Sequence, residues 1–363
     1  MVPTTTTALI AAATLLQAAY AQDVFDTFTV NCQPLTVQRR DPLVQPGADL
    51  SDHVHSVIGG TAFSASLDPT KALASGATTC DKELDHSVYW TPQLYHITAD
   101  GKYEIVKFTG SAVYYQNRAC DYEAGRTACP SYTTSFAAAF PEGLQMVAGD
   151  PSLRTFDPAN LAHRAVSHMC MFKNRGGSEE TNSLPLEQCN DIRSQVTFPS
   201  CWDGQNLDSA DHKSHMSYPD PQYGNYNGGP CPASHPIALI TLFYEFHFDT
   251  SPYDDRNFVF AQGDKTGHGF HGDFVNGWKD LAKLGDAHRT CTGSGGVDAA
   301  GCSINVGADG SPGHATARDP ESAAPAENIG LDGVPLDELP GGKVPSGETP
   351  AARKRSRVFP GWY

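Results

Sequence analysis

The sequence predicts a mainly β protein: a single-domain antiparallel β-sandwich, jelly-roll-like, with long disulfide-stapled loops and a few short helices. Residues 93–108, QLYHITADGKYEIVKF, are two alternating runs joined by Asp100-Gly101, which is a strong hairpin signal. Residues 235–248, HPIALITLFYEFHF, are apolar, aromatic and β-branched, and fit a strand pair or one long bent strand. Helical periodicity is weak, and its best candidates are residues 157–172 and 274–291.

The chain divides into a leader, one domain and a tail. Residues 1–21 contain a short apolar run followed by Ala19-Tyr20-Ala21, which predicts a cleaved signal peptide. Residues 22–306 suit one large β-rich domain. Residues 307–363 are rich in Pro, Gly, Ala and acidic side chains, so we expect a disordered tail. Its Lys354-Arg355 pair is either a dibasic processing site or part of a solvated charge run.

Ten cysteines predict five disulfides, because an even count in an exported chain usually means bridges. Thiolate zinc sites need closely spaced cysteine pairs, and no two cysteines here are closer than nine positions. The sequence does not fix the pairing. Three pairs would each close a short loop: Cys120 with Cys129, Cys189 with Cys201, and Cys291 with Cys302.

The formal net charge is −16, which disfavours nucleic acid and anionic membranes as partners. Nothing after the leader reaches the length of a membrane span. We therefore expect a secreted, extracellular monomer whose partner is neutral.

Polar side chains suited to chemistry gather in four stretches. His53 and His55 form an H-x-H pair that shares one face if the segment is a strand, which fits a metal or acid-base site or two loop braces. Residues 200–219 hold Asp208, His212 and His215 between aromatic side chains, and a structural loop pinned by Cys201 is the alternative.

The third stretch is the strand around Glu245 and His247, where a buried carboxylate needs a partner or has a raised pKa. The fourth is residues 263–278, GDKTGHGFHGDFVNGW, with Asp264, His271 and Asp273 among five glycines. His271 and Asp273 share a face if extended, so the carboxylate would fix the tautomer of the histidine. The alternative is a glycine-rich turn whose polar groups satisfy one another.

These stretches, in order, resemble a known family. RRDPLVQPGADLSDHVHSVIGGTAF, FPSCWDGQNLDSADHKSHMSYP and FVFAQGDKTGHGFHGDFVNGW are among six motifs similar to the fungal secreted family known as a domain of unknown function, catalogue number nineteen-ninety-six. His268 stands where the family usually has Tyr, so His271 is the stronger candidate. The resemblance implies secretion, a fungal source, disulfides and association with cell-wall glycans, but no reaction.

The leading hypothesis is a carbohydrate-active enzyme that cleaves glycosidic bonds of a cell-wall or biomass polysaccharide, as a glycoside hydrolase or polysaccharide lyase. The candidate catalytic residues are Asp208, His212, His215, Asp264, His271, Asp273, His53 and His55. The candidate substrate-binding residues are Trp90, Trp202, Lys213, Tyr218 and Trp278. The hydrolase would draw its acid and base from Asp203, Asp208, Glu245, Asp264 and Asp273.

Two alternatives belong to other classes. One is a transition-metal site, with Zn or Cu held by His53, His55, His215 and His271 and possible catalysis at an open position. The other is a non-catalytic protein that binds wall glycans. Convergence of the histidines would indicate the metal, and separate groups beside paired carboxylates would indicate glycan cleavage.

Overall fold

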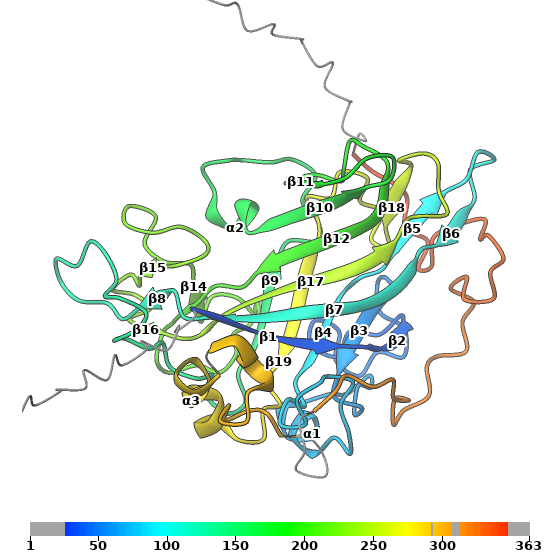
Figure 1. Ribbon diagram of the computed structural model, residues 1–363. Coiled ribbons are helices and arrows are strands. Elements are labelled where there is room, and N and C mark those ends of the chain that lie inside the picture. Colours follow the sequence, from blue (N-terminus) through cyan, green and yellow to red (C-terminus); the bar gives the residue numbers. More distant parts are fainter. Residues whose placement is uncertain (1–25, 292, 307–312, 348–363) are drawn as a thin grey trace, which may run out of the picture.

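Two antiparallel sheets packed face to face form the centre of the protein, in a computed structural model that describes residues 26–291, 293–306 and 313–347 (Figure 1). The six-stranded sheet has the order β1 (Thr27–Cys32), β7 (Lys107–Gln116), β17 (Thr241–Asp249), β12 (Cys189–Thr197), β10 (Val166–Phe172), β11 (Ser178–Thr181). The five-stranded sheet has the order β2 (Pro34–Gln38), β3 (His55–Gly59), β4 (Val88–Pro92), β19 (His271–Val275), β9 (Gln145–Gly149).

The main core lies between these two sheets. Tyr89 and Phe274 enter it from the five-stranded sheet, and Tyr244 and Phe246 enter it from the six-stranded sheet. The ring centroids of Tyr89 and Tyr244 are 6.0 Å apart across the interface. Alternation of side chains along the strands produces this arrangement, and the predicted mainly β sandwich is confirmed.

Smaller sheets and helices lie around the sandwich. The small sheets are β18 (Phe258–Phe260) with β5 (Leu94–Ile97) and β6 (Tyr103–Ile105); β14 (Met216–Ser217) with β13 (Cys201–Trp202) and β16 (Ile237–Ala238); and the parallel pair β15 (Gly229–Pro230) and β8 (Ala119–Cys120). The helices are α1 (Pro69–Ala74), α2 (Leu161–Arg164), α3 (Leu281–Thr290) and the 3-10 helix η1 (Gly293–Asp298).

The predicted hairpin is confirmed as β5 and β6, with Gly101 at a positive φ of 84° in the turn. The apolar run 235–248 forms two strands, β16 and β17, in different sheets. The helix expected over residues 157–172 is wrong beyond its first turn: α2 has only four residues, and the segment continues as β10. The alternating burial of Val166, His168 and Cys170 against the core decides that outcome.

All ten cysteines form disulfides. Two of the short loops are bridged as expected, Cys120–Cys129 and Cys291–Cys302. The third is not: Cys189 joins Cys170 across neighbouring strands, and Cys201 joins Cys231. Strand pairing, which sequence spacing does not reveal, decides this difference.

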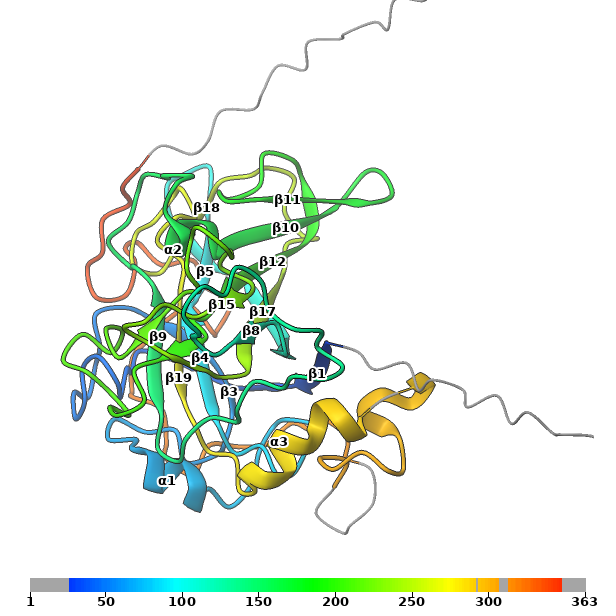
Figure 2. The same ribbon diagram turned by 90° about the vertical axis from the view of Figure 1, so that its left-hand side faces the viewer.

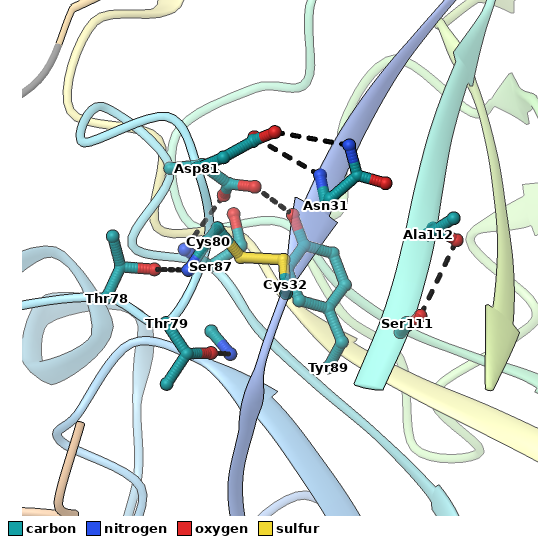
Figure 3. Close-up of a disulfide and its surroundings, with 12 residues drawn as sticks. Asn31, Cys32, Thr78, Thr79, Cys80, Asp81, Ser87, Tyr89, Ser111 and Ala112 are labelled. Atoms are coloured by element: carbon teal, nitrogen blue, oxygen red, sulfur yellow. Dashed lines mark hydrogen bonds between the residues drawn. A yellow bond between two sulfur atoms is a disulfide. The ribbon is translucent and has the colours of Figure 1, made fainter. Parts of the chain in front are cut away.

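The Cys32–Cys80 bridge ties the end of β1 to the segment before β4 (Figure 3). Beside it, the backbone N–H and the side-chain amide of Asn31 each donate to a carboxylate oxygen of Asp81, both at 3.2 Å. The hydroxyl of Thr79 accepts from the backbone of Gly59 at the end of β3. The bridge therefore connects the six-stranded sheet to the end of β3 in the five-stranded one.

Residues 313–347 are a strap that packs on the sandwich, and the expectation of a disordered tail is wrong for this stretch. Ile329 and Leu339 are buried in a cluster with Val54 and Tyr95. Ser346 pairs with the loop at Gly263 through a 2.7 Å backbone hydrogen bond. A few buried apolar side chains in a low-complexity segment are enough to order it here. The signal peptide prediction and Lys354-Arg355 lie outside the described residues.

None of the helices in the described ranges is long and apolar enough to cross a membrane.

Gly272 lets the two sheets approach closely beneath β19. A Cβ on this residue would lie 2.1 Å from the hydroxyl oxygen of Tyr244 and 2.7 Å from a methyl group of Val196. We expect Gly272→Ala to lower the free energy of unfolding by about 1–3 kcal/mol, because the packed neighbours must shift. Urea unfolding followed by fluorescence checks this.

The matched control is Gly285→Ala in α3, where the nearest atom would be 3.8 Å away and the change should stabilise by about 0.5–1 kcal/mol. The clash also predicts that Tyr244→Phe restores part of the loss in a double variant. An unchanged unfolding midpoint for Gly272→Ala would contradict the argument.

Candidate functional site

Three histidines meet on the outer face of the five-stranded sheet, the face turned away from the main core. His55 begins β3 and pairs with Pro92 of β4. Asp273 pairs with Trp90 on the other side of β4, so His271 two residues earlier lies level with Pro92 as well. His53 precedes His55 by two residues and comes to the same face. The sheet register therefore brings together residues more than two hundred positions apart in the sequence.

The nitrogen atoms of these histidines converge. His53 Nε2 and His271 Nε2 are 3.1 Å apart, and one ring nitrogen from each of the three histidines lies within 4.8 Å of the others. All three side chains are buried. Two nitrogens bound to one tetrahedral Zn²⁺ at 2.0–2.1 Å would be about 3.3 Å apart, so only small movements separate the cluster from a metal-bound arrangement.

Backbone carbonyls fix the tautomers of two of the histidines. The Nδ1–H of His55 donates to the carbonyl oxygen of Arg40 at 2.9 Å, and the Nδ1–H of His271 donates to that of Gly269 at 2.9 Å. A carbonyl only accepts, so Nδ1 carries the proton and Nε2 keeps its lone pair. His55 Nε2 is buried and has no hydrogen-bond partner among the described residues. Metal-ligating histidines are commonly held in this way, with the other ring nitrogen donating to a carbonyl oxygen.

Burial keeps the three imidazoles neutral. It lowers the pKa of His55 and of His271 to about 4, and the pKa of His53 well below its ordinary value. Nearby imidazoles and lysines, including Lys343 at His53 and Lys213 at His271, act in the same direction. Lone pairs for a cation are therefore available at neutral pH.

Asp264 shapes the loop that leads into His271. Its buried carboxylate accepts from the backbone N–H and hydroxyl of Thr266, at 2.8 and 2.6 Å, and from the N–H of Gly269 at 2.7 Å. Gly269 in turn holds the Nδ1 of His271. Asp264 is thus a positioning residue, which acts on His271 through Gly269 and does not itself belong to the histidine cluster.

Asp273 shares a face with His271, as expected, but does not fix its tautomer, because Gly269 does so. Its two carboxylate oxygens are buried and have no hydrogen-bond partner among the described residues. Burial, and then the nearby Asp41, raise the pKa of Asp273 well above its ordinary value. Its surroundings therefore favour the protonated, neutral form of this carboxyl group.

Residues 210–213 of the loop 208–215 line the same cleft as His53 and His271. His212 has a positive φ of 56° and its Nδ1 lies 2.8 Å from Asp208 Oδ1. Lys213 Nζ donates to the carbonyl of Gly149 at 2.5 Å. His215 contacts Ser209 Oγ and the carbonyl of Gln145, at 2.9 and 2.8 Å, and is not part of the histidine cluster. His215 is a loop brace, which corrects its place in the expected metal set.

A cleft of about 530 Å³ opens beside the cluster, and His53 and His271 are in its lining. Charged side chains of both signs surround it, among them Asp41, Lys213 and Lys343. A second hollow of about 390 Å³ also has Val147 and Lys213 in its lining, so it lies next to the cleft. One side of the cluster thus faces an open cleft.

Two of the four expected aromatic platforms are internal. Trp90 and Trp278 are 0% and 1% exposed, so neither can stack on a substrate at the surface, which corrects that prediction. Trp90 packs against Phe63 in an apolar cluster, and Trp278 donates from Nε1 to the hydroxyl of Tyr115 in the main core. Trp202 is partly exposed and donates to the carbonyl of Asn206. Tyr218 lines the second hollow, and its hydroxyl donates to the carbonyl of Thr197.

The five carboxylates considered for glycosidic cleavage lie in different places. Asp264 and Asp273 are buried, and Glu245 lies on the other sheet. Asp203 accepts from the backbone of Gln205 and Asn206 in its own loop, and Asp208 contacts His212. None of the five lines the cleft; Asp41, Asp52 and Asp211 do.

Several residues that form the histidine cluster and its cleft were not identified from the sequence. The carbonyls of Arg40 and Gly269 carry no side-chain signal. Asp41 lies in a conspicuous motif but was not singled out, and Lys343 belongs to the segment expected to be disordered.

Fold and site together define a disulfide-stapled β-sandwich protein with a buried three-histidine cluster at the edge of a cleft. The chain belongs to the family described as a domain of unknown function, DUF1996, whose family model matches residues 41–278. That range includes all three histidines and ends before the strap. Comparisons with curated proteins and with solved structures gave no match.

Proposed function

We propose that this protein binds one divalent transition metal ion through His53, His55 and His271 and presents it to the adjoining cleft. The observation that carries the proposal is the convergence of three buried, neutral imidazoles, two of them held through Nδ1–H so that Nε2 carries a lone pair. Burying three such groups together is costly unless something satisfies their lone pairs.

The donor set indicates the kind of ion. Imidazole nitrogens suit Zn²⁺ and Cu²⁺, whereas Mg²⁺ and Ca²⁺ prefer oxygen ligands. Three histidines with an open side are typical of catalytic rather than structural zinc sites, where the ion acts as a Lewis acid. The cleft beside His53 and His271 supplies that open side. The proposed class is therefore a metal-dependent enzyme.

The test is elemental analysis of protein purified without a histidine tag and dialysed against Zn²⁺ or Cu²⁺. We expect close to one equivalent of metal per chain, removable by a chelator and restored by titration. Less than about a tenth of an equivalent after loading with either metal would end this proposal.

Glycosidic bond cleavage in a wall or biomass polysaccharide is the second candidate, as hydrolase or lyase. The hollow next to the cleft supports it, because a chain-like substrate could contact both while passing the histidine cluster. Release of reducing ends or of unsaturated products from a polysaccharide panel tests it. Loss of that release on chelation would join the two candidates into one mechanism.

Export to the cell exterior is part of the same proposal. The five disulfides support it, because they persist in oxidising compartments. The predicted leader at residues 1–21 is in keeping with it.

A further inference from the structure

A third hollow, polar and of about 250 Å³, lies on the outer face of the six-stranded sheet. It is on the opposite side of the sandwich from the histidine cluster. Figure 1 shows β7, β17 and β12 across the front of the molecule, and Figure 2 shows the same sheet edge-on with no helix over its middle. Since Tyr244 and Phe246 point into the core, their neighbours Phe243 and Glu245 point outward.

Polar side chains in this hollow are unusually buried for the solvent face of a sheet. Gln195, Glu245 and Gln116 are 3%, 4% and 5% exposed. Outward polar residues are ordinary in antiparallel sheets, but they are normally hydrated rather than enclosed. Their neighbours enclose them at the floor of the hollow, which all three line.

A hydrogen-bond network holds these side chains in fixed positions. Glu245 Oε2 accepts from the hydroxyl of Tyr114 at 3.0 Å and lies 3.2 Å from Arg193 Nη1. Arg193 Nε donates to Gln195 Oε1 at 3.0 Å, and Gln195 Nε2 donates to Ser167 Oγ at 2.9 Å. The donors and acceptors are therefore arranged before any ligand arrives.

The network leaves bonding capacity unused. Gln116 Oε1 is buried, lines the hollow and has no hydrogen-bond partner among the described residues. Glu245 uses only Oε2 in the hydrogen bonds made within the described ranges. A buried amide oxygen without a partner is costly, so this position favours an external donor.

The chemistry of the lining indicates a neutral ligand with hydroxyl groups and an apolar face. The charged side chains in the lining balance: Arg118 and Arg193 against Glu180 and Glu245. Phe243 is half-buried in the lining, and its ring centroid is 5.2 Å from that of Tyr114 on the neighbouring strand. Aromatic faces bind the C–H side of a sugar ring while a few fixed polar groups bind its hydroxyls.

We propose that this hollow is a sugar-binding subsite, which holds a ring of a neutral glycan on the sheet face remote from the histidine cluster. It goes beyond the proposed metal function and does not depend on it. A protein built this way would hold a glycan on one face of the sandwich while the metal cleft occupies the other.

Isothermal titration calorimetry with cello-, laminari-, manno- and chitohexaose, each with and without EDTA, tests the proposal. We expect at least one hexaose to bind, with the same affinity with and without EDTA. Glu245→Gln and Phe243→Leu should each weaken binding about 10-fold or more, because one loses a charge-assisted hydrogen bond and the other a flat aromatic face. Glu179→Gln, an exposed carboxylate on β11, is the matched control and should bind as wild type.

Thermal unfolding checks that each variant is folded. If Glu245→Gln does not fold, Phe243→Leu still tests the proposal. Binding of none of the four hexaoses would overturn the proposal. So would binding that disappears with His271→Ala or with EDTA but survives Glu245→Gln and Phe243→Leu, since the glycan would then occupy the metal cleft. Failure of all four hexaoses to bind would leave the metal proposal untouched, because elemental analysis tests that proposal separately.

Discussion

His55→Ala and His271→Ala are each expected to raise the Kd for Zn²⁺ by at least about 100-fold. Loss of an outer-shell partner alone costs about 10–100-fold in metal affinity, and these variants remove a ligand itself. The two nitrogens at stake are the Nε2 atoms, which stay unprotonated because the carbonyls of Arg40 and Gly269 hold the proton on Nδ1. Competition titration with a chromogenic chelator measures the change.

Thermal unfolding gives a second readout of the same variants. A ligand present at about 1,000 times its Kd stabilises the folded state by about 4 kcal/mol, so Zn²⁺ should raise the Tm of the wild type clearly. That increase should vanish in His55→Ala and His271→Ala at the same Zn²⁺ concentration. Unfolding in EDTA reports the cost of the substitution itself, separately from the metal.

The matched control is His235→Ala. His235 lies outside the cluster, where its ring contacts Ser234 and the carbonyl of Ser214. This variant should bind Zn²⁺ as the wild type does and keep the full increase in Tm. If His235→Ala and His271→Ala lose affinity equally, the bound ion is not in the cluster.

The sequence predicted much of the fold, because strand patterns are local. The hairpin at Asp100-Gly101 and the alternating run of β17 could be found from adjacent residues. The strand within residues 157–172 could not be found in this way. Their helical periodicity competes with a strand pattern, and packing on β12 decides between the two. The partner of Cys189 could not be predicted for the same reason, since it is set by pairing between strands.

The candidate site was predicted in its residue types but not in its geometry. His53, His55 and His271 were all singled out, and their positions in motifs were the signal. Their convergence depends on the register of β3, β4 and β19, which one sequence does not contain. His215 carried an equal sequence signal and lies elsewhere, because its ring is bound to Ser209 and Gln145.

The strap is the largest difference between the expected and observed site, and it contacts the segments that carry the histidines. Arg39 Nε lies 2.8 Å from Glu327 Oε2 of the strap, and the same guanidinium donates to the carbonyl of Ser51 at 2.8 Å. Arg40, whose own carbonyl holds His55, donates to the carbonyl of Ala323 at 2.8 Å. These contacts connect the strap to Ser51, which lies two residues before His53, and to Arg40, which holds His55.

Leu339→Ala should therefore lower the free energy of unfolding by about 2–5 kcal/mol, as loss of a fully buried leucine does elsewhere. Leu339 is 0% exposed and belongs to the cluster of Val54, the residue between His53 and His55. Urea unfolding measures the loss. The matched control is Val344→Ala on the same strap, whose side chain is 81% exposed and should change stability by less than about 0.5 kcal/mol.

The same variant should weaken Zn²⁺ binding, but by less than removal of a ligand does. Leu339 is not a ligand and packs in the cluster that includes Val54, so its loss loosens the positions of His53 and His55 while all three nitrogens remain. A several-fold rise in the Kd for Zn²⁺, measured where the variant is still folded, would show that the strap helps to hold the histidines. An unchanged Kd beside a large loss of stability would make the strap a support of the fold alone, because the cluster would then keep its geometry without Leu339.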